Sequence, residues 1–272
     1  MKTKFLSFDK DRLDKIASEH SKKYQNSEPT NHTYIDNILS DEVAEKVLEE
    51  FPGKNDIEWI KKEGDNKHEY KMACEDTEQF PPTIRQVLSQ CNSETFVDFL
   101  EKLTGIKGLI PDPHYRGGGI HQIVRGGFLK VHVDFNWYPR FRIERRVNVI
   151  LFFNKDWKEE YGGHFELWDK DMKNAVVKVP PLFNRAAIFS TSEDSYHGHP
   201  DPLNFPEGTS RKSLALYYYT SPATDDDARA KAHSTIFKNR PGEEFKKNTN
   251  WKFFVKQLIP PIVITFIKKI KW

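Results

Sequence analysis

Apolar residues recur at helical spacing in two stretches of the first hundred positions. The first stretch follows Ser40, a residue type that caps helices, and begins with two acids at the positive end of the helix dipole. It stops at Pro52-Gly53, a pair that ends helices. The second stretch covers residues 82–103 and is interrupted at Asn92-Ser93, so we expect two consecutive helices there.

After Gly105 the pattern changes to short runs rich in β-branched and aromatic residues, separated by Gly, Pro, Asn and Asp. Such spacing is typical of a sandwich or barrel. The predicted strands cover residues 128–133, 146–153, 163–168, 175–179, 185–190 and 213–219. We therefore predict a mainly β fold with flanking helices. A polar leader (1–32) precedes one domain (33–222), made of N-terminal helices (33–105) and a β core (106–222), and a helical tail (223–272) follows.

Composition narrows the classes of function. The 42 basic and 40 acidic residues leave a net charge of only +2, so there is no electrostatic reason to expect a nucleic-acid partner. Cys74 and Cys91 stand in no metal-finger spacing and fit inert thiols of a reducing compartment. The first residues contain no signal-like apolar run, and no stretch reaches the ~18 apolar residues of a membrane span. We expect a cytoplasmic protein.

The first candidate for chemistry is His132-Val133-Asp134, near the end of a predicted strand. Side chains two apart on a strand share a face, so His132 and Asp134 can bind one ion together. A lone triplet of this kind also occurs by chance as a solvated strand end. A third, distant ligand would complete the two-histidine, one-carboxylate set of non-haem Fe(II) sites, which leaves metal positions open for O2.

His197, just beyond the predicted strand 185–190, is our choice for that third ligand. His199 is the alternative; we prefer His197 because His199 adjoins Pro200 and fits a turn. His164 follows two glycines at the start of a predicted strand, where it is either structural or part of a substrate mouth. His121 leaves the same two alternatives open.

Arg211 opens the predicted strand that follows these histidines. An arginine at that place can form a bidentate pair with the distal carboxylate of 2-oxoglutarate. Ser213, two residues on, faces the same side and adds a hydroxyl group. Lys212 faces the other side of the strand, so we rank it below Arg211.

Longer motifs surround these residues: FNKDW at 153–157, YGGHFELW at 161–168 and FNRAAIF at 183–189. Together they resemble the prolyl-4-hydroxylase-like 2-oxoglutarate oxygenases over about residues 115–222, and YIDNIL at 34–39 resembles the entry to the fold in bacterial members. The resemblance implies a double-stranded β-helix, or jelly roll, with Fe(II) between its two sheets. It also implies hydroxylation of a C–H bond by O2 and 2-oxoglutarate, with succinate and CO2 as coproducts and ascorbate as an accessory candidate.

The sequence departs from this family at two positions. Oxygen-sensing prolyl hydroxylases have a cosubstrate-binding tyrosine where this chain has Gln122, and a second tyrosine where it has Phe152. Asn148, on the same strand face as Phe152, offers a replacement hydrogen bond. We therefore count Gln122 and Asn148 among the expected 2-oxoglutarate contacts and carry over no prolyl substrate. Asp134 is retained, which favours hydroxylation over halogenation.

Two loops are expected to form the mouth of the site: residues 111–124, which contain three consecutive glycines, and residues 135–140. The alternative is that these loops only cover the core. The favoured substrate is a small molecule or glycan. A protein (prolyl) hydroxylase is the second hypothesis, and a non-catalytic ligand-binding barrel is the third. The intact set of two histidines, a carboxylate and an arginine argues against the third.

The tail at 259–272 combines two prolines, an apolar run, three lysines and a terminal tryptophan. This composition suits a helix at the surface of an anionic membrane, which would place the protein peripherally at the inner face. Packing on the barrel or on a second subunit is the slightly favoured alternative. Similar tails occur on bacterial proteins of surface-polysaccharide synthesis, and this resemblance points to an envelope precursor as substrate.

Overall fold

The structure of the chain is a computed structural model that describes residues 8–62, 69–222 and 231–243. The tail at 259–272 lies outside these residues and remains a prediction. Of the predicted helical segment 223–272, the structure describes only residues 231–243, which contain a short strand at Ile236–Phe237 rather than a helix. Among the helices described, none combines the length and the apolar character that crossing a membrane requires.

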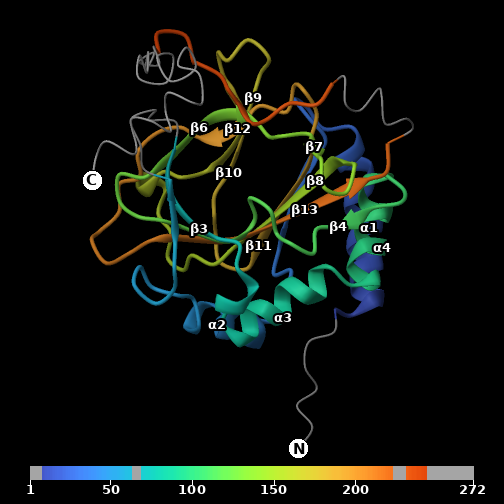
Figure 1. Ribbon diagram of the computed structural model, residues 1–272, viewed down its shortest axis with the longest axis horizontal. Coiled ribbons are helices and arrows are strands. Elements are labelled where there is room, and N and C mark those ends of the chain that lie inside the picture. The colour runs from blue at the N-terminus through green and yellow to red at the C-terminus, as the bar shows by residue number, and fades with distance from the viewer. Residues whose placement is uncertain (1–7, 63–68, 223–230, 244–272) are drawn as a thin grey trace, which may run out of the picture.

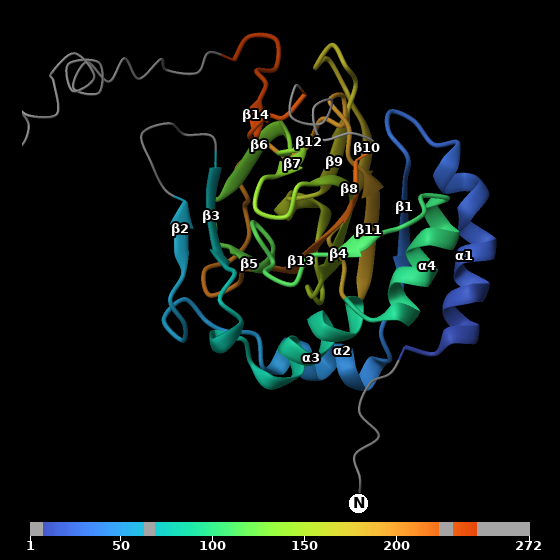
Figure 2. The same ribbon diagram turned by 45° about the vertical axis from the view of Figure 1, so that its right-hand side comes forward.

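Two antiparallel sheets form the centre of the molecule (Figures 1 and 2). The first sheet contains, in spatial order, β1 (His32–Asp36), β11 (Arg185–Ser190), β8 (Ile143–Phe152), β13 (Arg211–Thr220), β5 (Gly119–Ile123) and β3 (Glu69–Cys74). The second continues from β3 through β6 (Phe128–Val133), β12 (His197–His199), β9 (Phe165–Trp168) and β10 (Ala175–Val179). Shorter strands lie at the margins: β2 (Ile60–Lys62), β4 (Ile110–Pro111), β7 (Trp137–Tyr138) and β14 (Ile236–Phe237). This arrangement confirms the predicted double-stranded β-helix.

Four helices cover the outer face of the first sheet (Figure 2). They are α1 (Lys10–Gln25), α2 (Asp41–Glu49), α3 (Pro82–Cys91) and α4 (Glu94–Thr104); two 3-10 turns, η1 (Thr77–Gln79) and η2 (Glu159–Tyr161), lie in connections. The break between α3 and α4 falls at Asn92-Ser93, as the apolar pattern predicted. Ser40 stands at the N-cap of α2, but its side chain makes no capping hydrogen bond.

The predicted leader is part of this helical layer. Asp9 caps α1 by accepting a hydrogen bond from the Arg12 backbone, and Leu13, Ala17 and Tyr24 are buried against α4 and β1. The expected boundary at residue 33 therefore does not separate two units of the fold. The segment expected to hold only helices, 33–105, also contributes β1, β2 and β3.

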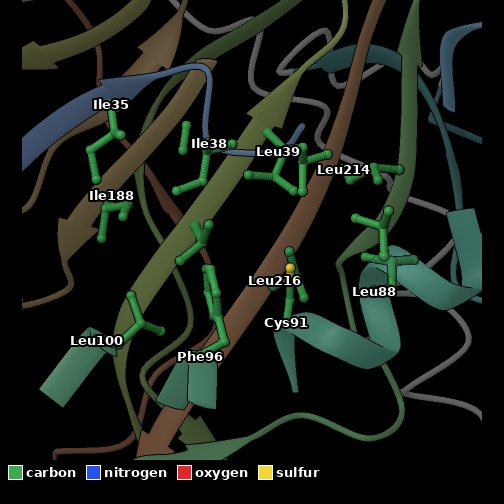
Figure 3. Close-up of a cluster of buried hydrophobic side chains, with 14 of the residues drawn as sticks. Ile35, Ile38, Leu39, Leu88, Cys91, Phe96, Leu100, Ile188, Leu214 and Leu216 are labelled. Atoms are coloured by element: carbon green, nitrogen blue, oxygen red, sulfur yellow. The ribbon is translucent and has the colours of Figure 1, made fainter. Parts of the chain in front are cut away.

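Alternation along the central strands separates the core from the site. On β8, Val147, Val149 and Leu151 point toward the helices, where they join Leu214 and Leu216 of β13 in the main hydrophobic cluster (Figure 3). Full burial of each such side chain contributes about 1.5–3 kcal/mol. The intervening positions, Asn148 and Ile150 among them, line a cavity between the two sheets. The helical side therefore stabilises the sheet, and the inner side is left for chemistry.

A β-bulge interrupts this alternation at one place. Val147 pairs with Tyr218, but Arg145 pairs with the next residue, Tyr219, so Arg146 is the extra residue on β8. A bulge re-aims the side chain beside it. Here it turns Arg145 to the same side of the sheet as Asn148, to which Arg145 is hydrogen-bonded.

Candidate active site

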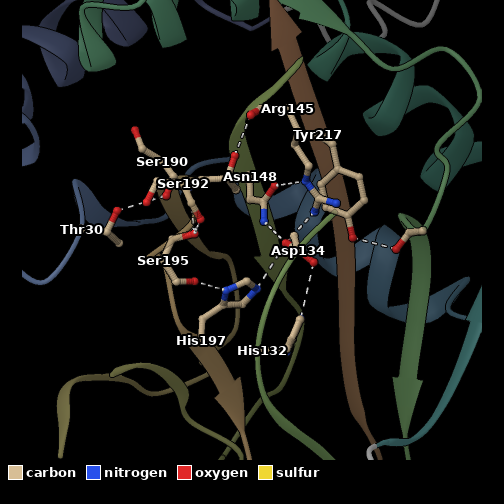
Figure 4. Close-up of polar contacts among 12 residues, drawn as sticks. Thr30, His132, Asp134, Arg145, Asn148, Ser190, Ser192, Ser195, His197 and Tyr217 are labelled. Carbon is tan, nitrogen blue, oxygen red and sulfur yellow. Dashed lines mark hydrogen bonds and ion pairs between the residues drawn. The ribbon is translucent and has the colours of Figure 1, made fainter. Parts of the chain in front are cut away.

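His132, Asp134 and His197 form a cluster at the inner edge of the second sheet (Figure 4). His132 is on β6 and pairs directly with His197 on the neighbouring β12, and Asp134 follows the end of β6. One possible ligand atom from each residue lies within 4.8 Å of the others. The structure thus brings the predicted triad together from two strands that are far apart in the sequence.

Backbone carbonyl groups fix both imidazole rings of the cluster. Nδ1 of His132 lies 2.8 Å from the Lys130 carbonyl oxygen, and Nδ1 of His197 lies 2.8 Å from that of Ser195. Because a carbonyl oxygen only accepts, each Nδ1 carries the proton. Nε2 is then the nitrogen free to bind a metal, and it lies on the side of Asp134, at 3.5 Å from Oδ1 for His132 and 3.3 Å from Oδ2 for His197. This is the tautomer and orientation that a divalent metal requires.

Asp134 is held in turn by Asn148 and Arg145 (Figure 4). The Asn148 amide nitrogen donates to Oδ2 at 2.8 Å, and Arg145 Nη2 lies 2.8 Å from the same oxygen as an ion pair whose angle is outside that of a hydrogen bond. Arg145 Nε also donates to the side-chain amide oxygen Oδ1 of Asn148 at 2.8 Å, and its guanidinium lies over the Tyr217 ring. The position of the Asp134 carboxylate is therefore set by groups other than the two histidines.

These contacts decide the charges in the cluster. Burial acts to raise the pKa of Asp134, but the charge of Arg145, together with His197 and His132, lowers that pKa well below its usual range. Burial, and then the neighbouring His197, lower the pKa of His132. At neutral pH the cluster therefore presents a carboxylate and a neutral imidazole from His132, a donor set that binds divalent transition metals.

A small cavity of about 80 Å³ extends from the cluster between the two sheets. Arg211 and Ser213, the predicted 2-oxoglutarate contacts, both line it. Lys212 does not line the cavity, as the alternation of β13 predicted. The cavity is narrow and reaches the metal-ligating atoms directly, which fits a small ligand that contacts both the metal and Arg211.

Arg211 is a buried cation with no acidic partner in the described chain. Its Nε donates to the Gly163 carbonyl oxygen at 2.8 Å, and its guanidinium carbon lies 4.9 Å from the centre of the Phe152 ring. Burial lowers the pKa of Arg211 to about 9, so it is still charged at neutral pH. An uncompensated buried charge is costly, and a ligand carboxylate would offset that cost.

Gly163 allows this arrangement. It has a φ of +70°, and a Cβ at this position would come within 2.4 Å of Leu203 and 3.1 Å of the Arg211 side chain. Any other residue would therefore clash with Leu203 and crowd the Arg211 side chain.

The remaining histidines separate into three environments. His199 lines the small cavity and is absent from the cluster, so the geometry favours His197 as the third ligand. His121 lines the same cavity, while its Nε2 lies 3.1 Å from the Gly117 carbonyl oxygen. His164 lies 3.0 Å from Glu159 and lines none of the cavities described here, which agrees with its structural alternative.

Gln122 does not contact the cavity, contrary to the prediction. His121 and Ile123 of β5 line it, so alternation turns Gln122 to the opposite face. There its amide nitrogen donates to Ser210 Oγ at 2.9 Å and to the Pro52 carbonyl oxygen at 3.3 Å. Asn148 does line the cavity, but its amide is engaged with Asp134 and Arg145.

A wider cavity opens in front of the cluster, and another adjoins it. The first, about 340 Å³, has His132 and Asp134 in its floor and charged residues in its wall: Glu69, Lys71, Glu75, Arg116 and Arg145. The second, about 380 Å³, shares Arg116, Phe135 and Thr235 with the first and adds Trp137 and Pro139. Both predicted mouth loops are therefore at the cavity walls. Phe237 of β14 completes the first cavity, with its ring 5.4 Å from that of His132.

Sequence reasoning missed Arg145, Tyr217 and Lys71. Arg145 was hidden by the bulge, because simple alternation places it on the helical side with Val147. Tyr217 shares its strand face with Arg211 and Ser213, which alternation along β13 would have revealed. Lys71 comes from β3, in a segment that the sequence analysis assigned to helices.

Comparisons with known proteins agree with this geometry. Residues 118–219 match the model of the 2OG-Fe(II) oxygenase superfamily. No curated protein is similar to the chain at the level of sequence.

Several solved structures have the same fold. A Trichoplax adhaerens prolyl hydroxylase, in complex with a peptide fragment of the hypoxia inducible factor oxygen degradation domain, superposes with a TM-score of 0.58 and 16% identity, over 85% of this chain and 99% of that one. A prolyl 4-hydroxylase from Phytophthora capsici superposes with a TM-score of 0.55 and 18% identity, over 94% of this chain and 77% of that one. For a Pseudomonas putida prolyl-4-hydroxylase the TM-score is 0.53 and the identity 15%, over 75% of this chain and 98% of that one. At such identities the likeness establishes the fold.

Proposed function

Since residues 118–219 belong to the 2OG-Fe(II) oxygenase superfamily, we propose that this 2-oxoglutarate-dependent enzyme hydroxylates a C–H bond of a polar small molecule or glycan. The observation that carries the proposal is the charged wall of the 340 Å³ cavity directly in front of the metal-ligating cluster. A substrate that fills this space meets more charged and polar side chains than apolar ones.

We assign the iron to His132, Asp134 and His197. The donor set fits Fe(II): two neutral imidazole nitrogens and one carboxylate on one face leave the other metal positions open. The fit also rests on the orientation of both Nε2 atoms toward Asp134. When bound, the ion supplies O2 activation coupled to oxidative decarboxylation of 2-oxoglutarate to succinate and CO2.

We assign 2-oxoglutarate to the small cavity. Arg211 offers an unpaired guanidinium for one carboxylate, and Ser213 adds a hydroxyl donor beside it. The cluster lies along the same cavity, so the other end of the cosubstrate would face the metal. The chain's own contribution is to orient this ligand and keep bulk water away from it, since the cavity has room for little else.

The roles of Arg145 and Asn148 follow from their contacts with Asp134. Both contact the Oδ2 atom of Asp134, which fixes the angle at which this carboxylate would meet the metal. Outer contacts of this kind orient metal ligands and tune metal affinity. Neither residue needs to gain or lose a proton in this role.

A prolyl residue of a protein is the second candidate substrate. The two wide cavities adjoin through Arg116, Phe135 and Thr235, and together they would accommodate an extended chain. The three solved structures described above are prolyl hydroxylases, one of them in complex with a peptide.

One experiment separates these candidates. The protein, reconstituted with Fe(II) in the absence of oxygen, is exposed to O2 and 2-oxoglutarate with polar metabolites, nucleotide sugars and envelope glycan precursors, or with proline-rich peptides. We expect succinate formation to be stimulated by a member of the first group, with one oxygen atom added to that compound by mass spectrometry. Stimulation and oxygen incorporation confined to the peptides would replace our proposal with the second candidate.

A further inference from the structure

His199 is a buried histidine that the iron site does not use. It lies on β12 two residues from His197, so both rings project from the same side of the strand. It pairs with Leu129 rather than Lys130 because β6 has a bulge opposite β12. Gly198 between the two histidines lies so close to β6 that a Cβ would come within 2.8 Å of the Leu129 carbonyl oxygen. Because Gly198 has no side chain, β12 lies close to β6 at this position, and both histidine rings face the small cavity.

Both nitrogens of His199 lack a partner. Nδ1 and Nε2 are each buried, and neither makes a hydrogen bond with any other group in the described chain. The residue as a whole is only 5% exposed. His132 and His197, by contrast, each bond a carbonyl oxygen through Nδ1. A buried polar group without a partner destabilises a protein by about 1–3 kcal/mol, so a ligand that satisfies it is the expected reason for its presence.

The surroundings of His199 define the charge of that ligand. Arg211 and Lys71 also line the cavity that His199 lines. Its one carboxylate is that of Asp134, which belongs to the metal-ligating cluster and is ion-paired with Arg145. Lys71 forms an ion pair with Glu69 at 3.4 Å, but Glu69 lies outside the small cavity. An imidazole N–H next to these cations is therefore placed to donate to an anionic acceptor that the ligand supplies.

We propose that His199 is a cosubstrate-binding residue that donates a hydrogen bond to the 2-oxoglutarate carboxylate paired with Arg211. This inference rests on the proposed function and adds a contact to it. Arg211 and His199 would then approach the carboxylate from two neighbouring strands of the cavity wall, β13 and β12. The arrangement explains why a histidine occupies a buried position without a partner and outside the metal cluster.

The test measures 2-oxoglutarate binding by calorimetry to protein loaded with Mn(II), a redox-inactive substitute for Fe(II), without oxygen. His199→Leu removes the donor, and we expect 2-oxoglutarate affinity to fall about tenfold, the size of one hydrogen bond to a charged group. His199→Gln keeps an N–H donor and should recover most of that loss. His20→Leu is the matched control, because His20 is a histidine on α1 that bonds Thr33 and lines none of the cavities described here.

Two further readouts distinguish this role from others. Mn(II) affinity should be unchanged in His199→Leu, and a large loss would make His199 a metal ligand and overturn the inference. The ligand-free His199→Leu protein should melt at the same or a higher temperature than wild type, because an unpartnered polar group has been replaced by an apolar one. A lower melting temperature would mean that His199 is structural, and would also overturn it.

The outcomes also separate this inference from the proposed function. If wild-type protein loaded with Mn(II) binds no 2-oxoglutarate, the proposed function itself fails. If wild type binds and Arg211→Met does not, while His199→Leu binds as wild type does, the function stands and the role of His199 is refuted.

Discussion

The two ends of the active site differ in how their polar groups are satisfied. At the metal end, His132 and His197 each bond a backbone carbonyl oxygen, and Asp134 is held by Asn148 and Arg145. At the cosubstrate end, Arg211 has no acidic partner and His199 has no hydrogen bond within the described chain. The first end is ordered by the protein alone, and the second has groups that only a ligand can satisfy.

This difference predicts that substitutions at the two ends change the stability of the ligand-free protein in opposite directions. A change at the metal end removes a metal ligand or disturbs a network that is complete without the metal. Such a change should weaken metal binding, and the stability of the protein should stay the same or fall. A change at the cosubstrate end removes a group that is costly in the ligand-free protein, so it should impair binding and raise ligand-free stability. The experiments below are ordered by the size of the expected effect.

The largest effect is expected from the metal ligands. His132→Ala, Asp134→Ala or His197→Ala should weaken Mn(II) binding by more than about 100-fold, the upper range for residues that only support ligands. Calorimetry measures the affinity, and circular dichroism checks that the fold persists.

His199→Ala is the control for these three variants and should bind Mn(II) as wild type does. Full affinity in His197→Ala together with loss in His199→Ala would reverse our choice between the two histidines of β12.

A smaller but still large effect is expected at Arg211. Arg211→Met should weaken 2-oxoglutarate binding at least about tenfold, since losing one partner of a buried charge pair costs about 2–5 kcal/mol. Mn(II) binding should hardly change. Lys212→Met, the neighbour on the other side of the strand, is the matched control. If Lys212→Met had the effect and Arg211→Met did not, β13 would be displaced by one residue.

The melting temperature of Arg211→Met also tests the difference between the two ends of the active site. The pKa of Arg211 in the folded protein, about 9, lies below that of an exposed arginine. Folding therefore carries the cost of a buried charge at every pH below 9, and this cost would decline only as the pH rises above that value. Arg211→Met should raise the melting temperature of the ligand-free protein at pH 7, and added 2-oxoglutarate should stabilise wild type more than the variant.

An intermediate effect is expected from Arg145. Arg145→Gln should weaken Mn(II) binding about 10–100-fold, because the carboxylate of Asp134 loses its ion pair. The loss should also depend on pH. In wild type the pKa of Asp134 is held low, so its carboxylate stays ionised and its contribution is lost only as the pH falls through that low value. Without Arg145 the pKa rises, and metal binding should disappear at a higher pH during acidification. Arg146→Gln, at the bulge, should behave like wild type in both measurements.

Alternation and spacing were sufficient to predict helices α2 to α4 and six strands of the β core, whereas the double-stranded β-helix was implied by the family resemblance. The predicted bounds of β6, β10 and β11 agree with the structure residue for residue, and the two consecutive helices α3 and α4 meet where Asn92-Ser93 predicted. These elements follow from local periodicity, which depends on a few neighbouring residues. The grouping of His132 with Asp134 followed from the same rule, and the choice of His197 followed from its place just beyond the predicted strand 185–190 and from Pro200 beside His199.

The remaining features depend on non-local geometry. Arg145 reaches Asp134 because of a bulge that depends on how β8 pairs with β13, and no pattern within β8 reveals it. The buried state of His199 depends on the approach of β6 to Gly198, so its sequence context, next to Pro200, suggested only a turn. Likewise β3, assigned to the helical segment, contributes Lys71 because it bridges the two sheets.

A substitution of Gln122 is expected to have the smallest effect on 2-oxoglutarate binding. It tests whether the strand geometry, rather than the family match, decides which face of β5 this residue occupies. Gln122 was predicted as a cosubstrate contact by matching its position to a family tyrosine, but one residue decides which face of a strand a side chain occupies. Gln122→Leu should change 2-oxoglutarate affinity by no more than about twofold, as expected for a site independent of the cavity. It should lower the free energy of unfolding by about 1 kcal/mol, because Ser210 and the Pro52 carbonyl lose a donor. His121→Leu, on the adjacent cavity-facing position, should weaken binding more. The opposite result, a loss of about tenfold in Gln122→Leu with His121→Leu unaffected, would shift β5 by one residue and return Gln122 to the cosubstrate site.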